Sequence, residues 1–178
     1  MEILITRHGQ TDWNVIGKVQ GKADIELNAN GIKQAEETSK ILENEKIDLI
    51  ICSPLKRAKQ TADIINKNRN IPIIYDNEIA ERDFGEFEGI NKSDFDYDGF
   101  WSYKKDLHFN SAENIKDFYN RVYKFLNKIK ENYPNKRILI VAHGGISIPV
   151  NCYFNGIPED DDLLKLCLKN CEVAKYEF

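Results

Sequence analysis

The sequence of 178 residues predicts an α/β fold, a three-layer α/β/α sandwich with a mostly parallel central sheet and a small cap insertion. Short apolar runs alternate along the chain with longer segments whose apolar residues recur at helical spacing, which is the pattern of strands joined by crossover helices. No internal repeat and no linker-like stretch interrupts this alternation. We therefore expect a single domain over residues 1–178, a length that can bury a core of its own.

Five runs predict the strands. Four are strongly apolar and typical of buried strands, whereas the fifth alternates apolar with polar residues and is typical of an edge strand. In chain order they cover residues 3–5, 48–52, 71–75, 137–142 and 173–178. Ligands bind beyond the carboxyl ends of parallel strands, so the residues that follow these runs are the first places to search for a site.

Four segments predict the helices of the two outer layers. Asn28 or Asn30 suits the N-cap of the first, and the third carries a stripe of apolar residues on one face. Pro149 falls in the fourth and is expected in its first turn, the part of a helix that tolerates proline. In chain order the helices cover about residues 28–42, 55–66, 112–133 and 146–153.

The segment from residue 79 to residue 111 follows neither the strand period nor the helix period. It is rich in aspartate, glycine and aromatic residues, which predicts loops with short helical pieces. We expect residues 84–113 to form a small cap region. Two interpretations stay open, a lid over a ligand site or a surface excursion that its aromatic residues anchor to the core.

Composition and charge exclude several classes of protein. Hydrophobic residues make up 42% of the chain and charged residues 30%, as in a soluble globular protein. The net charge of −4 argues against nucleic-acid binding, which usually requires a basic surface. The apolar run after Met1 is too short for a signal peptide or a membrane span. These features predict a cytoplasmic protein without a membrane partner, and they leave a homodimer as one option.

The four cysteines do not predict a metal site. Cys52 lies in an apolar run and is expected to be a buried thiol. Cys167 and Cys171 have the spacing of neighbours on one face of a helix, but a zinc site needs further ligands and no histidine is close in sequence. The sequence therefore predicts no metal ion and no other cofactor.

Two histidines stand where a ligand is expected. His8 and His143 each follow a predicted core strand and precede a glycine, and Arg7 and Arg57 lie near strand ends. Arginine offers a permanent charge and fork-shaped donors to phosphate oxygens, and a helix N-terminus after His143-Gly144-Gly145 would add amide donors. Neutral imidazole is a good nucleophile near pH 7. Together these residue types point to phosphoryl transfer, which fixed positive charge can support without magnesium.

Four motifs carry a family resemblance. Residues 7–14 resemble the R-H-G-[EQ]-T-x-x-N signature of the histidine phosphatase superfamily, in its phosphoglycerate mutase-like branch. Residues 53–62, 81–89 and 141–145 are similar to the later motifs of that family, in the same order. The resemblance spans nearly the whole chain, and within the family it is to short bacterial phosphatases such as α-ribazole phosphatase-like members.

The resemblance implies a role for each matching residue. His8 would be the nucleophile that forms a phosphohistidine, and Glu81 would be the proton donor and later the base. The groups implied to bind the phosphoryl oxygens are Arg7, Asn14, Arg57, His143 and Gly144. Outside this set, Thr11 is a candidate for holding the loop, Glu88 is interpreted as a loop carboxylate, and His108 as a surface or lid residue.

The resemblance leaves three functions open. A phosphomonoester hydrolase acting on a small phosphorylated metabolite is favoured, because the interval from Glu81 to His143 is shorter than the mutases of this family tend to have. A mutase would use the same residues, and a non-catalytic phospholigand-binding protein would usually lack one of them. One departure falls at residues 110–114, where family members often have Gly-Gly-Glu-Ser, so the backbone there is expected to differ.

Overall fold

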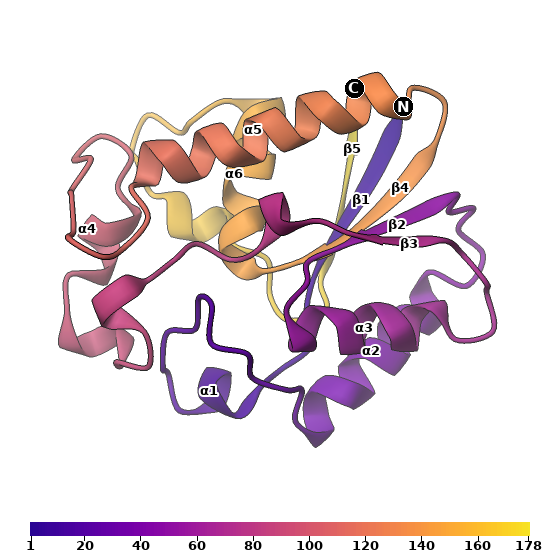
Figure 1. Cartoon of the computed structure of the whole chain (residues 1–178), viewed down its shortest axis with the longest axis horizontal. Helices are drawn as coiled ribbons and strands as arrows, with labels where there is room; N and C mark the ends of the chain where they lie inside the picture. Colours follow the sequence, from indigo (N-terminus) through magenta and orange to yellow (C-terminus); the bar gives the residue numbers. More distant parts are fainter.

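The computed structural model describes all 178 residues and has a central sheet of five strands (Figure 1). The strands lie in the order β3-β2-β4-β1-β5; the first four in sequence run parallel, and β5 pairs antiparallel with β1. Their bounds are β1 Glu2–Arg7, β2 Leu49–Cys52, β3 Ile73–Tyr75, β4 Arg137–Ala142 and β5 Val173–Glu177. The expected mostly parallel sheet, with its last strand at an edge, is confirmed.

Helices cover both faces of this sheet. In Figure 1, α5 and α6 lie above the sheet, and α2 and α3 lie below it. The helices are α1 Asp12–Val15, α2 Ala29–Ile41, α3 Lys56–Asn66, α4 Tyr97–Trp101, α5 Ile115–Asn132 and α6 Gly144–Asn155. The expected three-layer sandwich is confirmed, and α1 is a short helix that the apolar periodicity did not predict.

The strand residues divide the core between the two layers. Ile3 and Ile5 pack with the residues of α5 and α6, whereas Leu4 between them packs on the opposite side with those of α2 and α3. Successive side chains of a strand point to opposite faces, so an unbroken apolar run serves both cores. The carboxyl ends of the three central strands are level, because Arg7 lies opposite Ala142 and Cys52 opposite Val141.

Two local expectations were wrong. Helix α6 begins at Gly144, directly after its N-cap His143, so Pro149 lies in its second turn rather than its first. The predicted helix began only at about residue 146, after the glycine pair, because glycine disfavours helices. In the structure a Cβ on Gly144 or Gly145 would lie within 3.0 Å of Cys167 Sγ or Glu81 Oε1 respectively, so both positions favour glycine. Cys167 and Cys171 do not lie on a helix: the 3₁₀ turn before them ends at Leu166, and Cys171 has a φ of 61°.

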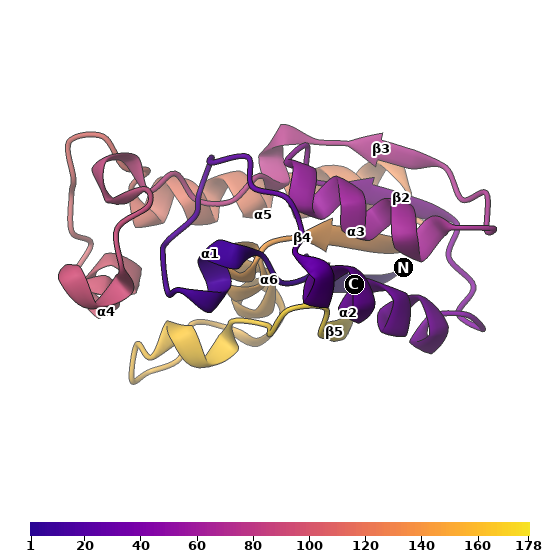
Figure 2. The same cartoon turned by 90° about the horizontal axis from the view of Figure 1, so that it is seen from below.

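The aromatic segment is continuous with the main core. Phe84, Phe100 and Trp101 are buried in the same cluster as α5 and α6, and the Phe84 and Phe100 rings stack with 4.9 Å between centroids. Short 3₁₀ turns and α4 make up the segment, which extends from one end of the sandwich in two perpendicular views (Figures 1 and 2). Its aromatic side chains therefore anchor it, as one of the two interpretations expected.

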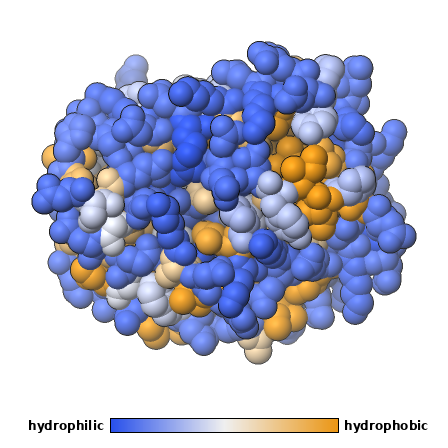
Figure 3. Space-filling model, in the orientation of Figure 1, coloured by the Kyte–Doolittle hydropathy of each residue, from blue (hydrophilic) through white to orange (hydrophobic).

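The surface seen in the orientation of Figure 1 is mainly hydrophilic, with separate small apolar patches (Figure 3). None of the helices combines the length and the apolar character that crossing a membrane requires.

Candidate active site

His8 extends the β1 ladder by one residue. Its backbone N–H donates to Ala142 O at 2.9 Å, which fixes the residue at the carboxyl edge of the sheet. Its Nδ1 lies 2.7 Å from Gly9 O, and a carbonyl can only accept, so Nδ1 carries the proton and the Nε2 lone pair is free. Burial lowers the pKa of His8 well below its usual value, and the charges of Arg57 and Arg7 lower it further. The ring is therefore neutral at pH 7.

His143 stands beside His8 at the next strand end. The two ring centroids are 5.2 Å apart, and the His143 ring is fully buried. Its Nε2 lies 2.6 Å from Ser53 Oγ, and its buried Nδ1 has no partner within the chain. If the Ser53 hydroxyl donates to Nε2, the proton of the neutral ring is on Nδ1 and is available to an acceptor.

Arg57 is completely buried in the first turn of α3. Its Nη1 donates to Ala23 O and its Nη2 to Gly21 O, both at 2.7 Å, while its Nε has no partner. Burial lowers the pKa of Arg57 to about 10, so the side chain stays charged at neutral pH. The forked end thus supports a loop, and the Nε–H is left without a partner within the chain.

Arg7 ends β1 and faces the C-terminal part of the chain. Its Nη1 donates to Leu168 O at 3.0 Å, and its buried Nε has no partner. A side chain on Gly144 could not fit here, because a Cβ would lie 3.2 Å from the Arg7 Cζ and 2.8 Å from Cys167 Sγ. The start of α6 is therefore packed tightly against this guanidinium.

Glu81 is held by two backbone donors. The N–H of Arg82 donates to Oε1 at 2.9 Å, and the N–H of Gly145 donates to Oε2 at 3.0 Å. A Cβ on Gly145 would lie 2.1 Å from Oε1, so only glycine allows this approach. Burial raises the pKa of Glu81, and the two amide hydrogen bonds oppose that shift. Such a carboxyl suits proton transfer near neutral pH better than an ordinary one.

Five of the seven predicted residues line one pocket. Arg7, His8, Asn14, Glu81 and Gly144 line it together, whereas Arg57 and His143 are not part of its lining and lie buried next to His8. The sheet thus brings together residues far apart in sequence. Arg7 Nε, Arg57 Nε and His143 Nδ1 are buried without a partner within the chain, and arginine N–H groups are donors of the kind that phosphate oxygens accept.

Residues 3–178 of the chain match the family model described as "Histidine phosphatase superfamily (branch 1)", and this match decides the family. The chain belongs to the histidine phosphatase superfamily. The uncharacterised phosphatase PhoE of Bacillus subtilis is 39% identical over 99% of this chain and 90% of its own. The adenosylcobalamin/α-ribazole phosphatase of Escherichia coli is 29% identical over 90% of this chain and 82% of its own.

Solved structures of the superfamily have the same fold. Bacillus stearothermophilus YhfR matches with a TM-score of 0.89 and 28% identity, over 99% of this chain and 90% of that one. The α-ribazole phosphatase from Shigella flexneri matches with a TM-score of 0.85 and 28% identity, over 98% and 89%. The resemblance that the motifs predicted is confirmed.

Several residues around the superfamily's site were not predicted from the motifs. Asn170 donates from Nδ2 to His8 O at 2.9 Å and to Asn14 Oδ1 at 3.2 Å, and it lies in a C-terminal loop without a recognisable pattern. The outer part of the pocket is lined by side chains from the aromatic segment and the loop after α1, among them Lys18, Lys92, Tyr97 and Trp101. No periodicity could have placed them there.

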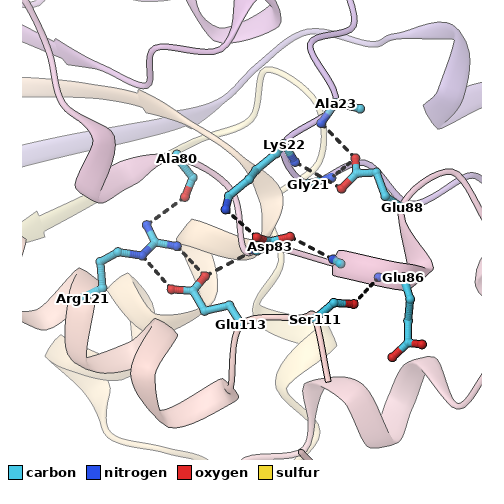
Figure 4. Close-up of polar contacts among 11 residues, drawn as sticks. Gly21, Lys22, Ala23, Ala80, Asp83, Glu86, Glu88, Ser111, Glu113 and Arg121 are labelled. Carbon is cyan, nitrogen blue, oxygen red and sulfur yellow. Dashed lines mark hydrogen bonds and ion pairs between the residues drawn. The ribbon is translucent and has the colours of Figure 1, made fainter. Parts of the chain in front are cut away.

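Two loop residues have more defined roles than expected. Thr11 caps α1 in a capping box with Asn14, and its hydroxyl donates to Gln20 Oε1 at 3.0 Å. Glu88 accepts the N–H groups of Gly21 and Ala23 at 2.8 and 3.0 Å (Figure 4). The carboxylate of Glu88 and the guanidinium of Arg57 thus hold the same loop, one by its amides and the other by its carbonyls.

Proposed function

We propose that the chain is a metal-independent phosphomonoester hydrolase that acts on a small phosphorylated metabolite through a phosphohistidine on His8. The observation that carries this proposal is the protonation state and hydrogen bonding of His8. His8 is buried and neutral, and its Nδ1–H donates to Gly9 O. Its free Nε2 shares a pocket with Arg7 and with Glu81, a carboxyl of raised pKa, and the charge of Arg57 also acts on the ring.

In the first half of the reaction, His8 Nε2 attacks phosphorus and the bond from phosphorus to the ester oxygen breaks. Protonated Glu81 gives its proton to that oxygen, and the alcohol leaves. The free Nε–H groups of Arg7 and Arg57 and the Nδ1–H of His143 donate to the phosphoryl oxygens. Asn14 and Gly144 line the same pocket and assist in binding.

In the second half, water takes the place of the alcohol. Glu81, now a carboxylate, removes a proton from the water, whose oxygen attacks phosphorus. The bond from phosphorus to Nε2 breaks, inorganic phosphate leaves and His8 returns to its neutral state. The acid of the first step is the base of the second, so a single carboxyl suffices.

The two arginines supply the positive charge that a metal ion provides in other phosphoryl-transfer enzymes. We therefore expect hydrolysis of p-nitrophenyl phosphate to proceed in excess EDTA at the rate seen without it. Vanadate should inhibit, since it takes up the five-coordinate geometry of the transferring phosphoryl group. The measurement is the release of p-nitrophenol and of inorganic phosphate by the purified protein.

Two results would contradict this proposal. Loss of activity in EDTA that added Mg²⁺ restores would show that a metal is required. Conversion of 3-phosphoglycerate to 2-phosphoglycerate with little release of phosphate, especially with 2,3-bisphosphoglycerate present, would make the chain a mutase. The short interval between Glu81 and His143 favours the hydrolase.

We further propose that residues 84–113 act as a cap that selects the substrate. The outer pocket carries Lys18 and Lys92, neither of which forms an ion pair with the chain's own carboxylates. Two unpaired cations beyond the arginines suit a phosphate ester that carries a second anionic group. Two relatives from Hydrogenobacter thermophilus are named as phosphoserine phosphatases, whose substrate has this chemistry.

Phosphoserine and phosphoethanolamine form a matched pair of substrates, because they differ only in the carboxylate. We expect phosphoserine to have the higher kcat/KM, and Lys92→Met to reduce that preference by about tenfold, the value of one charge-assisted contact. Lys33→Met, far from the pocket lining, is the matched control. Equal kcat/KM values for the two esters in the unmodified protein would refute the second-anion preference.

A further inference from the structure

We propose that Glu113 and Arg121 are positioning residues for Glu81, and that their ion pair fixes the backbone that carries this carboxyl. The inference rests on the proposed role of Glu81 as proton donor. Neither residue lines the pocket that contains His8, so they do not act by binding the substrate. They line a separate hollow on the other side of the Glu81 loop.

Arg121 holds the backbone just before Glu81. It projects from the second turn of α5, and its Nη1 donates to Glu78 O at 2.7 Å. The same Nη1 also donates to Ala80 O at 2.9 Å (Figure 4). Both carbonyls lie within three residues of Glu81 on its N-terminal side. A long helix packed on the core thus fixes the point at which the chain enters the site.

Glu113 completes the arrangement from the residue pair just before α5. Its carboxylate accepts both Nε and Nη2 of Arg121 at 2.8 Å, which is the bidentate geometry. Its Oε2 also accepts the N–H of Asp83 at 3.3 Å, and its own N–H donates to Asp83 O at 2.9 Å. Glu113 therefore orients Arg121 and holds the backbone just after Glu81.

Arg82 connects Glu113 to the aromatic segment through hydrogen bonds to both. Its Nε donates to Glu113 O at 2.9 Å and its Nη1 to Phe100 O at 2.5 Å, with the guanidinium 3.7 Å from the centre of the Phe100 ring. The loop around Glu81 is thus held by the side chains of two arginines, Arg82 and Arg121, and of one glutamate, Glu113. Regular secondary structure does not hold it, since residues 81–84 belong to no helix or strand.

This support matters because the carboxyl of Glu81 has only backbone partners, the N–H groups of Arg82 and Gly145. A shift of the Glu81 backbone would move the carboxyl off Gly145 with no side chain to retain it. Misplacement of a reacting group by about 1 Å can cost about 10²-fold in rate. The side chains of Arg121 and Glu113 are 23% and 19% exposed, so water screens their attraction less than that of a surface pair.

The test compares two esters in Arg121→Met and Glu113→Gln. Proton donation matters most for a poor leaving group, so kcat/KM for an alkyl phosphate should fall at least about tenfold more than that for p-nitrophenyl phosphate. When Glu81→Gln is already present, either substitution should have little further effect on the alkyl ester. Lys128→Met is the matched control, because it breaks an ion pair of the same helix with Asp76 and Glu78 and should leave the ratio unchanged.

A purely structural role predicts a different outcome. Both esters would then slow equally in Arg121→Met and Glu113→Gln, in proportion to any loss of folded protein measured by thermal unfolding, and the inference would be wrong. Glu113→Gln keeps the shape of the side chain, so it tests the pair even if Arg121→Met unfolds. An unmodified protein that releases no phosphate from either ester would instead refute the proposed hydrolase function itself.

Discussion

His8→Ala is expected to lower kcat for p-nitrophenyl phosphate by at least about 10³-fold, the scale on which enzymes lose activity when their nucleophile is removed. The substitution removes Nε2, the nitrogen that we propose attacks phosphorus. The binding groups on Arg7, Arg57 and His143 stay in place, so KM should change much less than kcat. Steady-state kinetics of the two proteins measure both parameters.

The matched control for this variant is His108→Ala. His108 is exposed, its Nδ1 contacts Asn114 at 3.0 Å, and it takes no part in the pocket. We expect this variant to retain full activity. Protein quenched in alkali should also carry an alkali-stable, acid-labile phosphate in the unmodified chain and in His108→Ala, but not in His8→Ala. Appreciable turnover by His8→Ala would rule out His8 as the nucleophile.

The sequence predicted the centre of the sheet best, because β1, β2 and β4 are buried on both faces. That burial demands unbroken apolar runs, and residues 137–142 match β4 at both ends. The expectation failed at the start of α6, where glycine at two successive positions argues against a helix. Gly144 and Gly145 are required there by contacts with Arg7 and Glu81, which are distant in sequence. Tertiary contacts overrode local propensity, as they commonly do.

The sequence identified the residues at the inner end of the candidate site but not those that line its outer part. The inner groups follow strand ends or lie in motifs, so sequence position was enough to select His8, Arg57 and His143. The outer lining comes from segments without period, and its residues meet only because the aromatic side chains pack into the core. Asn170 lies outside the lining but was equally unpredictable, since nothing in its neighbourhood in the sequence marks it as a partner of His8 O.

Glu81→Gln is expected to slow the hydrolysis of an alkyl phosphate by about 10²-fold or more, the usual contribution of general acid catalysis. Glutamine has the same shape, and its one oxygen can still accept the N–H of Arg82 or of Gly145, although its NH2 group cannot accept the other. It has no proton to give to the leaving oxygen. An alkoxide is a poor leaving group that needs this proton, whereas p-nitrophenolate leaves without it, and the loss for that ester should be within about tenfold. Equal slowing of both esters would contradict the assignment of Glu81 as the acid.

The pH dependence of the alkyl ester gives an independent measure of the same group. Burial raises the pKa of Glu81, so the protonated form needed for the first step persists to higher pH than in an ordinary glutamate. As the pH rises through this raised pKa, kcat/KM should fall. His8 acts in the opposite sense: its pKa is lowered, so the imidazole stays neutral and nucleophilic until the pH is well below 6.5. Glu81→Gln should therefore remove the fall on the alkaline side and leave the acidic side unchanged, because only the alkaline limb belongs to the carboxyl.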